Sequence, residues 1–189
     1  MILKSLQISE PEPVQSLICF MIELENLFEH IGEYLLSSGE TVSTAESVTS
    51  GFLQFSFSQM KEASRFFKGG ITAYTLREKV GLLSVNEDEA RKYNCVSRQI
   101  AKTMALKVAA LYKTDWSIGI TGYALPVNES KGKLYCYFAI VYKGEVILSE
   151  KLDLHSRTKP GNAKLFYTEF VLGCFKLELD KYQKKNVSM

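Results

Sequence analysis

Segments with the two-residue period of a β-strand alternate along the chain with segments that have the 3.6-residue period of an α-helix. One strand is expected around residue 44, and two more at 69–75 and 115–122. The clearest helical patterns lie at 23–39 and 95–112, where apolar residues recur on one face. Strands that alternate with helices are typical of a sheet covered by helices, so the sequence predicts an α/β sandwich.

The second half of the chain adds an antiparallel hairpin and a last helix. Residues 133–142 and 145–154 both have strand patterns, and the Lys143-Gly144 pair between them suits a tight turn. A hairpin joined to parallel strands makes the predicted sheet mixed. The last helix is expected to begin near Pro160, because proline suits a first helical turn.

Shorter segments are less decisive. Residues 51–60 fit helix and strand almost equally well, and the alternation along the chain favours a helix there. Residues 76–83 fit a short helix, and Ser97 is expected to cap the helix at 95–112.

The length of 189 residues suits one domain with a substantial core. With 46% apolar and 23% charged residues, the composition is that of a soluble globular protein. A Glu-Pro-Glu-Pro segment disfavours helix, so we expect an irregular N-terminal extension at 1–20, a single domain at 21–182 and a flexible basic tail at 183–189. Besides Met1, Met21 is a candidate for the native start, because a helical pattern follows it directly.

Charge and cysteine spacing exclude several partners and sites. The net charge is +2 with the two signs interspersed, which is not typical of a nucleic-acid-binding protein. The apolar run at 17–22 is too short to span a bilayer. The four cysteines are far apart, without the spacing of a metal site or a disulfide scaffold, so we expect reduced thiols, no metal and a cytoplasmic location.

Polar residues follow three of the predicted strands. In open α/β sheets ligands bind at the carboxyl ends of the strands, which draws attention to Ser47, Tyr74 and Thr121. The preceding stretch STAE at 43–46 matches the capping box S/T-x-x-E, so it fits an ordinary helix start. Alternatively, Ser47 lies beside free backbone N–H groups at a helix N-terminus, where a developing oxyanion is stabilised.

A serine nucleophile at neutral pH needs a base. The two histidines, His30 and His155, do not fit a recognisable Ser-His-Asp order. A desolvated lysine with a lowered pKa is another possible base, and Lys79 follows Tyr74 by five residues. From the residues alone, a lysine on the surface of a helix is the more common interpretation of Lys79.

Four stretches together resemble the C-terminal domain of the CinA family, the nicotinamide-nucleotide amidohydrolases or NMN deamidases. The resemblance covers roughly residues 22–180, and the stretches are TVSTAESVTSG, GGITAYTLREKVGLLSV, VSRQIAKTMA and ITGYALP. It implies a three-layer α/β/α sandwich on a mixed, mostly parallel sheet of about five strands. It also implies a homodimer that hydrolyses the carboxamide of nicotinamide mononucleotide to nicotinate mononucleotide and ammonia without metal or cofactor.

The resemblance carries catalytic roles to Ser47, Tyr74, Lys79 and Thr121. Ser47 is expected to attack the amide carbon, Lys79 to take its proton, and Tyr74 to relay or orient that proton. Thr121 is expected to position the amide or bind the oxyanion. Within the quoted stretch, Thr44 or Ser43 is then expected to be the helix cap.

Substrate-binding roles fall on residues around that group. Arg157 suits the phosphate, because a guanidinium presents a planar set of donors. Thr49 and Gly122 are expected beside the substrate. Glu46 is expected either to orient Lys79 or to cap the helix, and the sequence does not choose between these two roles.

The chain also departs from the family pattern. Val48 and Ser50 stand where the family usually has a cysteine and a glycine, and the loop after Thr121 is shorter, with Tyr123 and Leu125 in place of smaller residues. A bulkier loop is expected to reshape the nucleotide pocket. The alternative function is therefore an inactive paralogue that binds a nucleotide or a protein partner.

Overall fold

The computed structural model describes the backbone of residues 13–187 and the side chains of residues 24–184. Five strands form one sheet in the order β2-β1-β3-β4-β5. The strands are β1 (Val42–Glu46), β2 (Phe67–Thr72), β3 (Trp116–Tyr123), β4 (Leu134–Tyr142) and β5 (Glu145–Leu154). Strand β1 lies parallel to both β2 and β3, and β4 runs antiparallel to β3 and β5. The predicted mixed sheet is confirmed.

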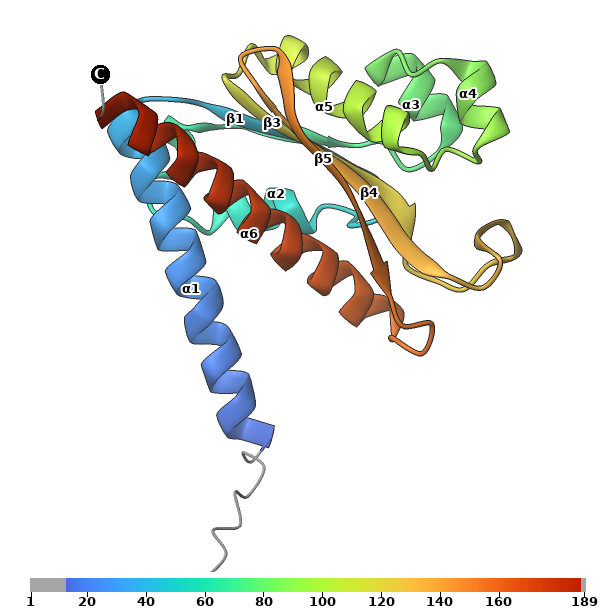
Figure 1. Ribbon diagram of the computed structural model, residues 1–189, viewed down its shortest axis with the longest axis horizontal. Coiled ribbons are helices and arrows are strands. Elements are labelled where there is room, and N and C mark those ends of the chain that lie inside the picture. The colour runs from blue at the N-terminus through green and yellow to red at the C-terminus, as the bar shows by residue number, and fades with distance from the viewer. Residues whose placement is uncertain (1–12, 188–189) are drawn as a thin grey trace, which may run out of the picture.

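Helices cover both faces of this sheet (Figure 1). Helices α1 (Pro13–Ser38), α2 (Phe52–Ser58) and α6 (Pro160–Val187) lie on one face. Helices α3 (Leu76–Leu83), α4 (Glu87–Lys92) and α5 (Arg98–Tyr112) lie on the other. Two short 3-10 turns lie at Ala63–Arg65 and Asn128–Ser130. The fold is therefore the three-layer α/β/α sandwich that the family resemblance implied.

The two faces of the sheet are packed differently. Large side chains fill the side of α1, α2 and α6, where the Trp116 and Phe175 rings meet edge to face at 5.4 Å. On the other side, α5 approaches β3 so closely that a Cβ atom on Gly119 would lie 2.4 Å from the carbonyl oxygen of Ala101. Only glycine allows that approach, which brings α5 against the centre of the sheet.

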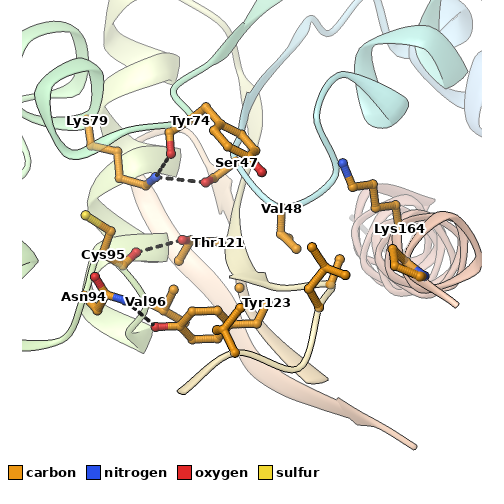
Figure 2. A pocket seen from close by; sticks show the side chains of 15 residues that line it. Ser47, Val48, Tyr74, Lys79, Asn94, Cys95, Val96, Thr121, Tyr123 and Lys164 are labelled. Carbon is orange, nitrogen blue, oxygen red and sulfur yellow. Dashed lines mark hydrogen bonds between the residues drawn. The ribbon is translucent and has the colours of Figure 1, made fainter. Parts of the chain in front are cut away.

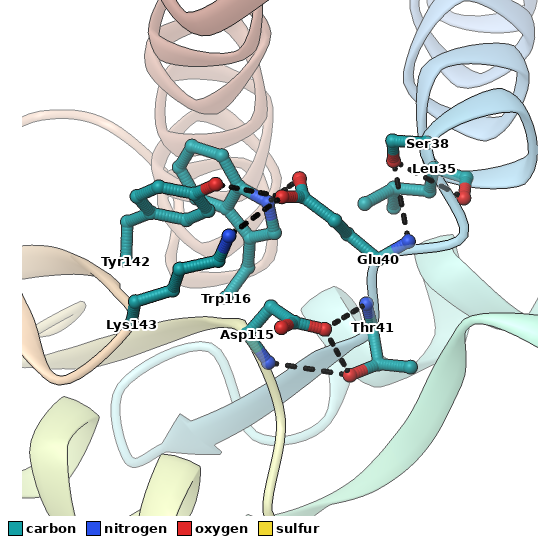
Figure 3. A network of polar contacts seen from close by, with 8 residues as sticks. All are labelled: Leu35, Ser38, Glu40, Thr41, Asp115, Trp116, Tyr142 and Lys143. Atoms are coloured by element: carbon teal, nitrogen blue, oxygen red, sulfur yellow. Dashed lines mark hydrogen bonds and ion pairs between the residues drawn. The ribbon is translucent and has the colours of Figure 1, made fainter.

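A polar network ties the amino-terminal end of β1 to its neighbours (Figure 3). The Glu40 carboxylate accepts hydrogen bonds from Trp116 Nε1 and the Tyr142 hydroxyl, both at 2.7 Å. Beside it, the Thr41 backbone N–H and hydroxyl both donate to the Asp115 carboxylate at 2.9 Å. These contacts fix the starts of β1 and β3, so the loops at the opposite, carboxyl ends are free to form a site.

The ends of the chain differ from the sequence prediction. Residues 13–20 are helical and belong to α1, so the irregular extension predicted for 1–20 does not hold there; residues 1–12 lie outside the described residues. At the other end, α6 continues to Val187, through most of the predicted flexible tail. Proline does not interrupt a helix at its first turn, and the lysines of the tail are good helix formers.

Other elements agree with the sequence. Residues 52–58 form a helix, α6 begins at Pro160, and the Ser97 side chain accepts from the backbone N–H of Ile100 as the cap of α5. Helix α4, capped by Asn86, was not predicted. Within residues 13–187 no helix is both long enough and apolar enough to cross a membrane. Among the residues that the structure describes, no cluster of three His, Cys, Asp or Glu side chains is placed to hold a metal ion.

Candidate active site

The loops that follow β1, β2 and β3 meet at a pocket of about 330 Å³ (Figure 2). Its lining includes Ser47, Tyr74, Lys79 and Thr121, which come from three separate parts of the chain. The three parallel strands bring these residues together, because their carboxyl ends lie at one edge of the sheet. The structure thus places all four residues that were predicted to be catalytic around one cavity.

Ser47 and Lys79 are joined directly. The Lys79 side-chain nitrogen lies 2.8 Å from Ser47 Oγ, 2.9 Å from the Ala73 carbonyl oxygen and 3.3 Å from the Tyr74 carbonyl oxygen. Only 1% of Lys79 is exposed. Burial lowers the pKa of Lys79, and nearby Cys95 and Glu78 oppose that shift in part. No carboxylate is hydrogen-bonded to this amine within the described residues, so burial is the largest influence on its pKa.

The position of Lys79 follows from the short connection between β2 and α3. Helix α3 begins at Leu76, so Lys79 lies in its first turn. Side chains on a helix point back toward its N-terminus, which here faces the ends of β1 and β2. A long side chain at this position therefore reaches into the pocket. The alternative interpretation of Lys79 as a surface lysine is wrong.

Glu46 caps helix α2 and makes no hydrogen bond with Lys79. It is fully buried, and its carboxylate accepts from the backbone N–H groups of Gly51, Leu53 and Gln54 at 2.8 to 3.1 Å. The Thr49 hydroxyl donates to the same carboxylate at 2.7 Å. Of the two roles left open for Glu46, the structure has the cap. Thr49 does not line the pocket, contrary to the expectation that it contacts substrate.

The predicted capping box is wrong. Ser43 and Thr44 are buried residues of β1, too early in the chain to cap α2, which begins at Phe52. Ser43 instead pairs with the Thr114 hydroxyl at 2.7 Å. The strand predicted around residue 44 is confirmed, because pairing of β1 on both sides keeps these residues extended.

The turn after Ser47 leaves backbone donors free. The Ser47 N–H donates to the Ile120 carbonyl oxygen at 3.1 Å. Within the described residues, the N–H groups of Val48 and Thr49 donate no hydrogen bond. The Val48 N–H is adjacent to the nucleophile candidate, where a donor for a developing oxyanion is needed.

The Thr121 hydroxyl makes a structural hydrogen bond. It is fully buried, and its hydroxyl donates to the Cys95 carbonyl oxygen at 2.8 Å. That proton is therefore not directed at a substrate oxygen, and Thr121 instead holds the turn at 94–95 against β3. Gly122 lines the pocket, but a Cβ atom there would lie 2.4 Å from the Tyr135 carbonyl oxygen, so pairing with β4 already requires glycine.

Tyr74 lies at the mouth of the pocket. Its side chain is 64% exposed, and within the described residues its hydroxyl makes no hydrogen bond. Its backbone carbonyl, rather than its phenol, contacts Lys79. This arrangement leaves the phenol group available to a ligand.

The cation at the pocket is not the one predicted. Arg157 is exposed in the loop between β5 and α6 and does not line the pocket, which corrects its assignment to the phosphate. Lys164, in the first turns of α6, lines the pocket (Figure 2). Its side-chain amine donates to Ser50 Oγ at 2.9 Å. The sequence signal for Lys164 was its distance of four residues from Pro160, which places it near the positive end of the α6 dipole.

Comparison with known proteins identifies the domain family that the sequence motifs resemble. The model of the CinA C-terminal domain family matches residues 24–165. A CinA-like protein from Nostoc sp. is 36% identical over 131 residues, covering 68% of this chain and 31% of its own length. One from Prochlorococcus marinus is 40% identical over 115 residues, covering 61% and 27%. The chain thus spans about a third of the length of these curated relatives.

Solved structures agree with the architecture. A competence or damage-inducible protein from Enterobacter asburiae has a TM-score of 0.77 at 23% identity, over 82% of this chain and 98% of its own. A CinA superfamily protein from Klebsiella pneumoniae has a TM-score of 0.76 at 20% identity, over 84% and 98%. At such identities the likeness shows a common fold.

Proposed function

The chain belongs to the CinA C-terminal domain family, and from that premise we propose that it is an amidohydrolase that deamidates nicotinamide mononucleotide. The observation that carries the proposal is the 2.8 Å contact between Ser47 Oγ and the buried Lys79 amine. A serine beside a desolvated lysine is a nucleophile beside its base. The products are nicotinate mononucleotide and ammonia.

The first step uses Lys79 in its neutral form. The lone pair on its nitrogen takes the Ser47 proton while Oγ forms a bond to the amide carbon. The charge that develops on the amide oxygen is stabilised by the free N–H of Val48. Lys79 then returns the proton to the amide nitrogen, the carbon–nitrogen bond breaks, and ammonia leaves an ester on Ser47.

The second step reverses these roles with water. A water molecule gives a proton to Lys79 and attacks the ester carbon, and the Ser47 oxygen leaves with that proton. The acid product and the free serine are regenerated. Because Lys79 donates to two backbone carbonyls, its nitrogen stays beside Ser47 in both steps.

The end of the pocket opposite Ser47 and Lys79 suits the phosphate of a substrate. Lys164 is cationic and lies near the N-terminus of the long helix α6, where the aligned backbone dipoles favour an anion. Its present partner is the neutral Ser50 hydroxyl, so binding a phosphate breaks no ion pair. The pocket thus has Lys79 at one end and Lys164 at the other, which matches a substrate that carries an amide at one end and a phosphate at the other.

A second candidate function is nucleotide binding without turnover. It is favoured by the bulk of Tyr123 and Leu125, which both line the pocket. The two functions differ in one assay, ammonia release by the purified protein from nicotinamide mononucleotide, nicotinamide riboside and nicotinamide. Fastest release from the mononucleotide supports the amidohydrolase. Calorimetric binding of the mononucleotide without ammonia release would reject the amidohydrolase function and support nucleotide binding without turnover.

A further inference from the structure

Tyr123 is held rigidly at the side of the pocket. Its hydroxyl accepts a hydrogen bond from Asn94 Nδ2 at 3.2 Å, and its carbonyl oxygen accepts one from the buried Tyr167 hydroxyl at 2.9 Å. Its ring meets the Tyr135 ring edge to face, with centroids 5.4 Å apart. Contacts from three different elements therefore fix both the backbone and the ring of this residue.

Asn94 lies in a turn whose backbone conformation allows its hydrogen bond to Tyr123. Asn94 and Cys95 have φ angles of 48° and 63°, in the left-handed region that costs most residues conformational energy. Two hydrogen bonds tie the turn to β3, one from Thr121 to the Cys95 carbonyl and one from Asn94 to Tyr123. Figure 2 shows both, with the Tyr123 ring extending from β3 to the Asn94 side chain.

Several of the residues that line the pocket with Tyr123 are apolar. Val48, Val96 and Leu125 line it together with the tyrosine ring. A group that enters beside them gains little from hydrogen bonding, so its shape and apolar contact decide the fit. A fixed aromatic ring offers a flat face, and aromatic rings stack on one another with a gain beyond their buried area.

We propose that Tyr123, held in place by Asn94, selects flat aromatic acyl groups for attack by Ser47. Tyr123 is the specificity-determining residue, and Asn94 is a positioning residue that acts through it. The inference rests on the proposed function in so far as Ser47 is the nucleophile, but it does not depend on the natural substrate. A saturated ring of the same size is thicker than an aromatic one and fits less well against the tyrosine face.

A matched pair of probes tests this selection. Two ethyl phosphonofluoridates are used, one with a phenyl group on phosphorus and one with a cyclohexyl group. In each reaction Ser47 Oγ forms a bond to phosphorus, the phosphorus–fluorine bond breaks, fluoride leaves and the serine proton passes to Lys79. Intact mass follows the labelling rate, and the ratio of the phenyl rate to the cyclohexyl rate is compared between variants, so that intrinsic reactivity cancels.

Four variants of the full chain separate the ring from its anchor. Tyr123→Ala removes the ring and is expected to lower the rate ratio by about tenfold. Tyr123→Phe and Asn94→Gly each remove the hydrogen bond, and each is expected to lower it by about threefold. Glycine at position 94 keeps the left-handed turn. Asn94→Asp replaces the amide donor with a carboxylate to which the Tyr123 hydroxyl can donate, so it keeps an anchor for the ring and is expected to hold the ratio near the wild-type value.

Tyr93→Ala is the control, because Tyr93 is exposed beside Asn94 and does not line the pocket. Its rate ratio is expected to equal that of the wild type. An unchanged ratio in Tyr123→Ala, or no labelling of Ser47 by either probe, would overturn the proposal. Selective labelling by a wild type that releases no ammonia from the mononucleotide would support the role of Tyr123 and reject the amidohydrolase function.

Discussion

The side-chain nitrogen of Lys79 lies 2.8 Å from the hydroxyl oxygen of Ser47, although 32 positions separate the two residues in the chain. Both side chains are buried, and no ionised partner is hydrogen-bonded to either one within the described residues. An amine in this environment loses its proton more easily than one in water. The contact therefore provides a base where a serine nucleophile requires one.

Ammonia release is expected to rise with pH as Lys79 loses its proton. Burial lowers the pKa of Lys79 below its usual value of 10.5, so the half-maximal rate is expected at a pH below 10.5. Initial rates measured over the pH range in which the protein stays folded check this. A profile that is flat, or that falls as the pH rises, contradicts a neutral lysine as the base.

Replacing Lys79 with methionine is expected to stabilise the fold and abolish the activity. Because the folded-state pKa is lowered, a protonated Lys79 destabilises the folded chain as the pH falls below 10.5, and the whole cost is present below the folded-state pKa. Lys79→Met removes it, so the free energy of unfolding at neutral pH is expected to rise by about 1 kcal/mol. The rate of ammonia release is expected to fall about a thousandfold.

Urea unfolding followed by the fluorescence of Trp116, the one tryptophan of the chain, measures that stability change. The gain is expected to shrink as the pH approaches 10.5. A methionine variant that keeps the wild-type rate, or that is less stable than the wild type at neutral pH, would contradict the account of Lys79.

The phosphate is expected to bind Lys164 and not Arg157. Lys164→Ala is expected to raise KM for nicotinamide mononucleotide about tenfold and to leave the rate with nicotinamide riboside unchanged, because only the first substrate carries a phosphate. Arg157→Ala is the matched control, since its side chain is exposed away from the pocket. Steady-state kinetics with the two substrates check both variants, and an equal loss in Arg157→Ala would refute this assignment.

Glu46 is expected to matter for stability. Its carboxylate accepts from three backbone N–H groups and one hydroxyl while fully buried. Glu46→Ala leaves these donors without a partner, so the free energy of unfolding is expected to fall by about 3 kcal/mol. Glu62→Ala removes an exposed partner of Arg65 and is expected to change it by less than about 0.5 kcal/mol. Similar losses in the two variants would argue against the cap.

The expected homodimer has a candidate surface on α6. This helix buries Tyr167, Val171 and Phe175, yet exposes Phe166, Phe170 and Leu177 on another face. A Cβ atom on Gly173, between the last two, would meet nothing within 4 Å. Antiparallel pairing of two copies about Gly173 places Phe170 of each copy near Leu177 of the other, which buries apolar side chains.

Gly173→Arg is therefore expected to convert a dimer to a monomer without loss of folding stability. Gly81→Arg in α3 is the control, because a Cβ atom there also meets nothing within 4 Å. Sedimentation equilibrium measures both variants. A monomeric wild type, or a dimer dissociation constant that is unchanged in Gly173→Arg, would exclude this surface as the dimer interface.

The periodicity of the sequence predicted the layers, because β3, α5 and the hairpin each repeat apolar residues at one clear period. It predicted the strand around residue 44, but the capping-box pattern there wrongly made Ser43 or Thr44 the helix cap, because the pattern does not show that these residues pair with β2 and β3. The family resemblance assigned Arg157 to the phosphate, and residue spacing alone does not show how the loop between β5 and α6 is folded. The buried state of Lys79 also depends on tertiary packing, which no local pattern encodes.

The initial rate of ammonia release from nicotinamide mononucleotide by Ser47→Ala tests the central claim most directly, with Ser58→Ala as the control. Ser58 is exposed on α2 and does not line the pocket. The expected result is a wild-type rate for Ser58→Ala and a loss of about a thousandfold or more for Ser47→Ala, with the fold retained in both. Equal rates in wild type and Ser47→Ala would contradict a serine nucleophile at this site.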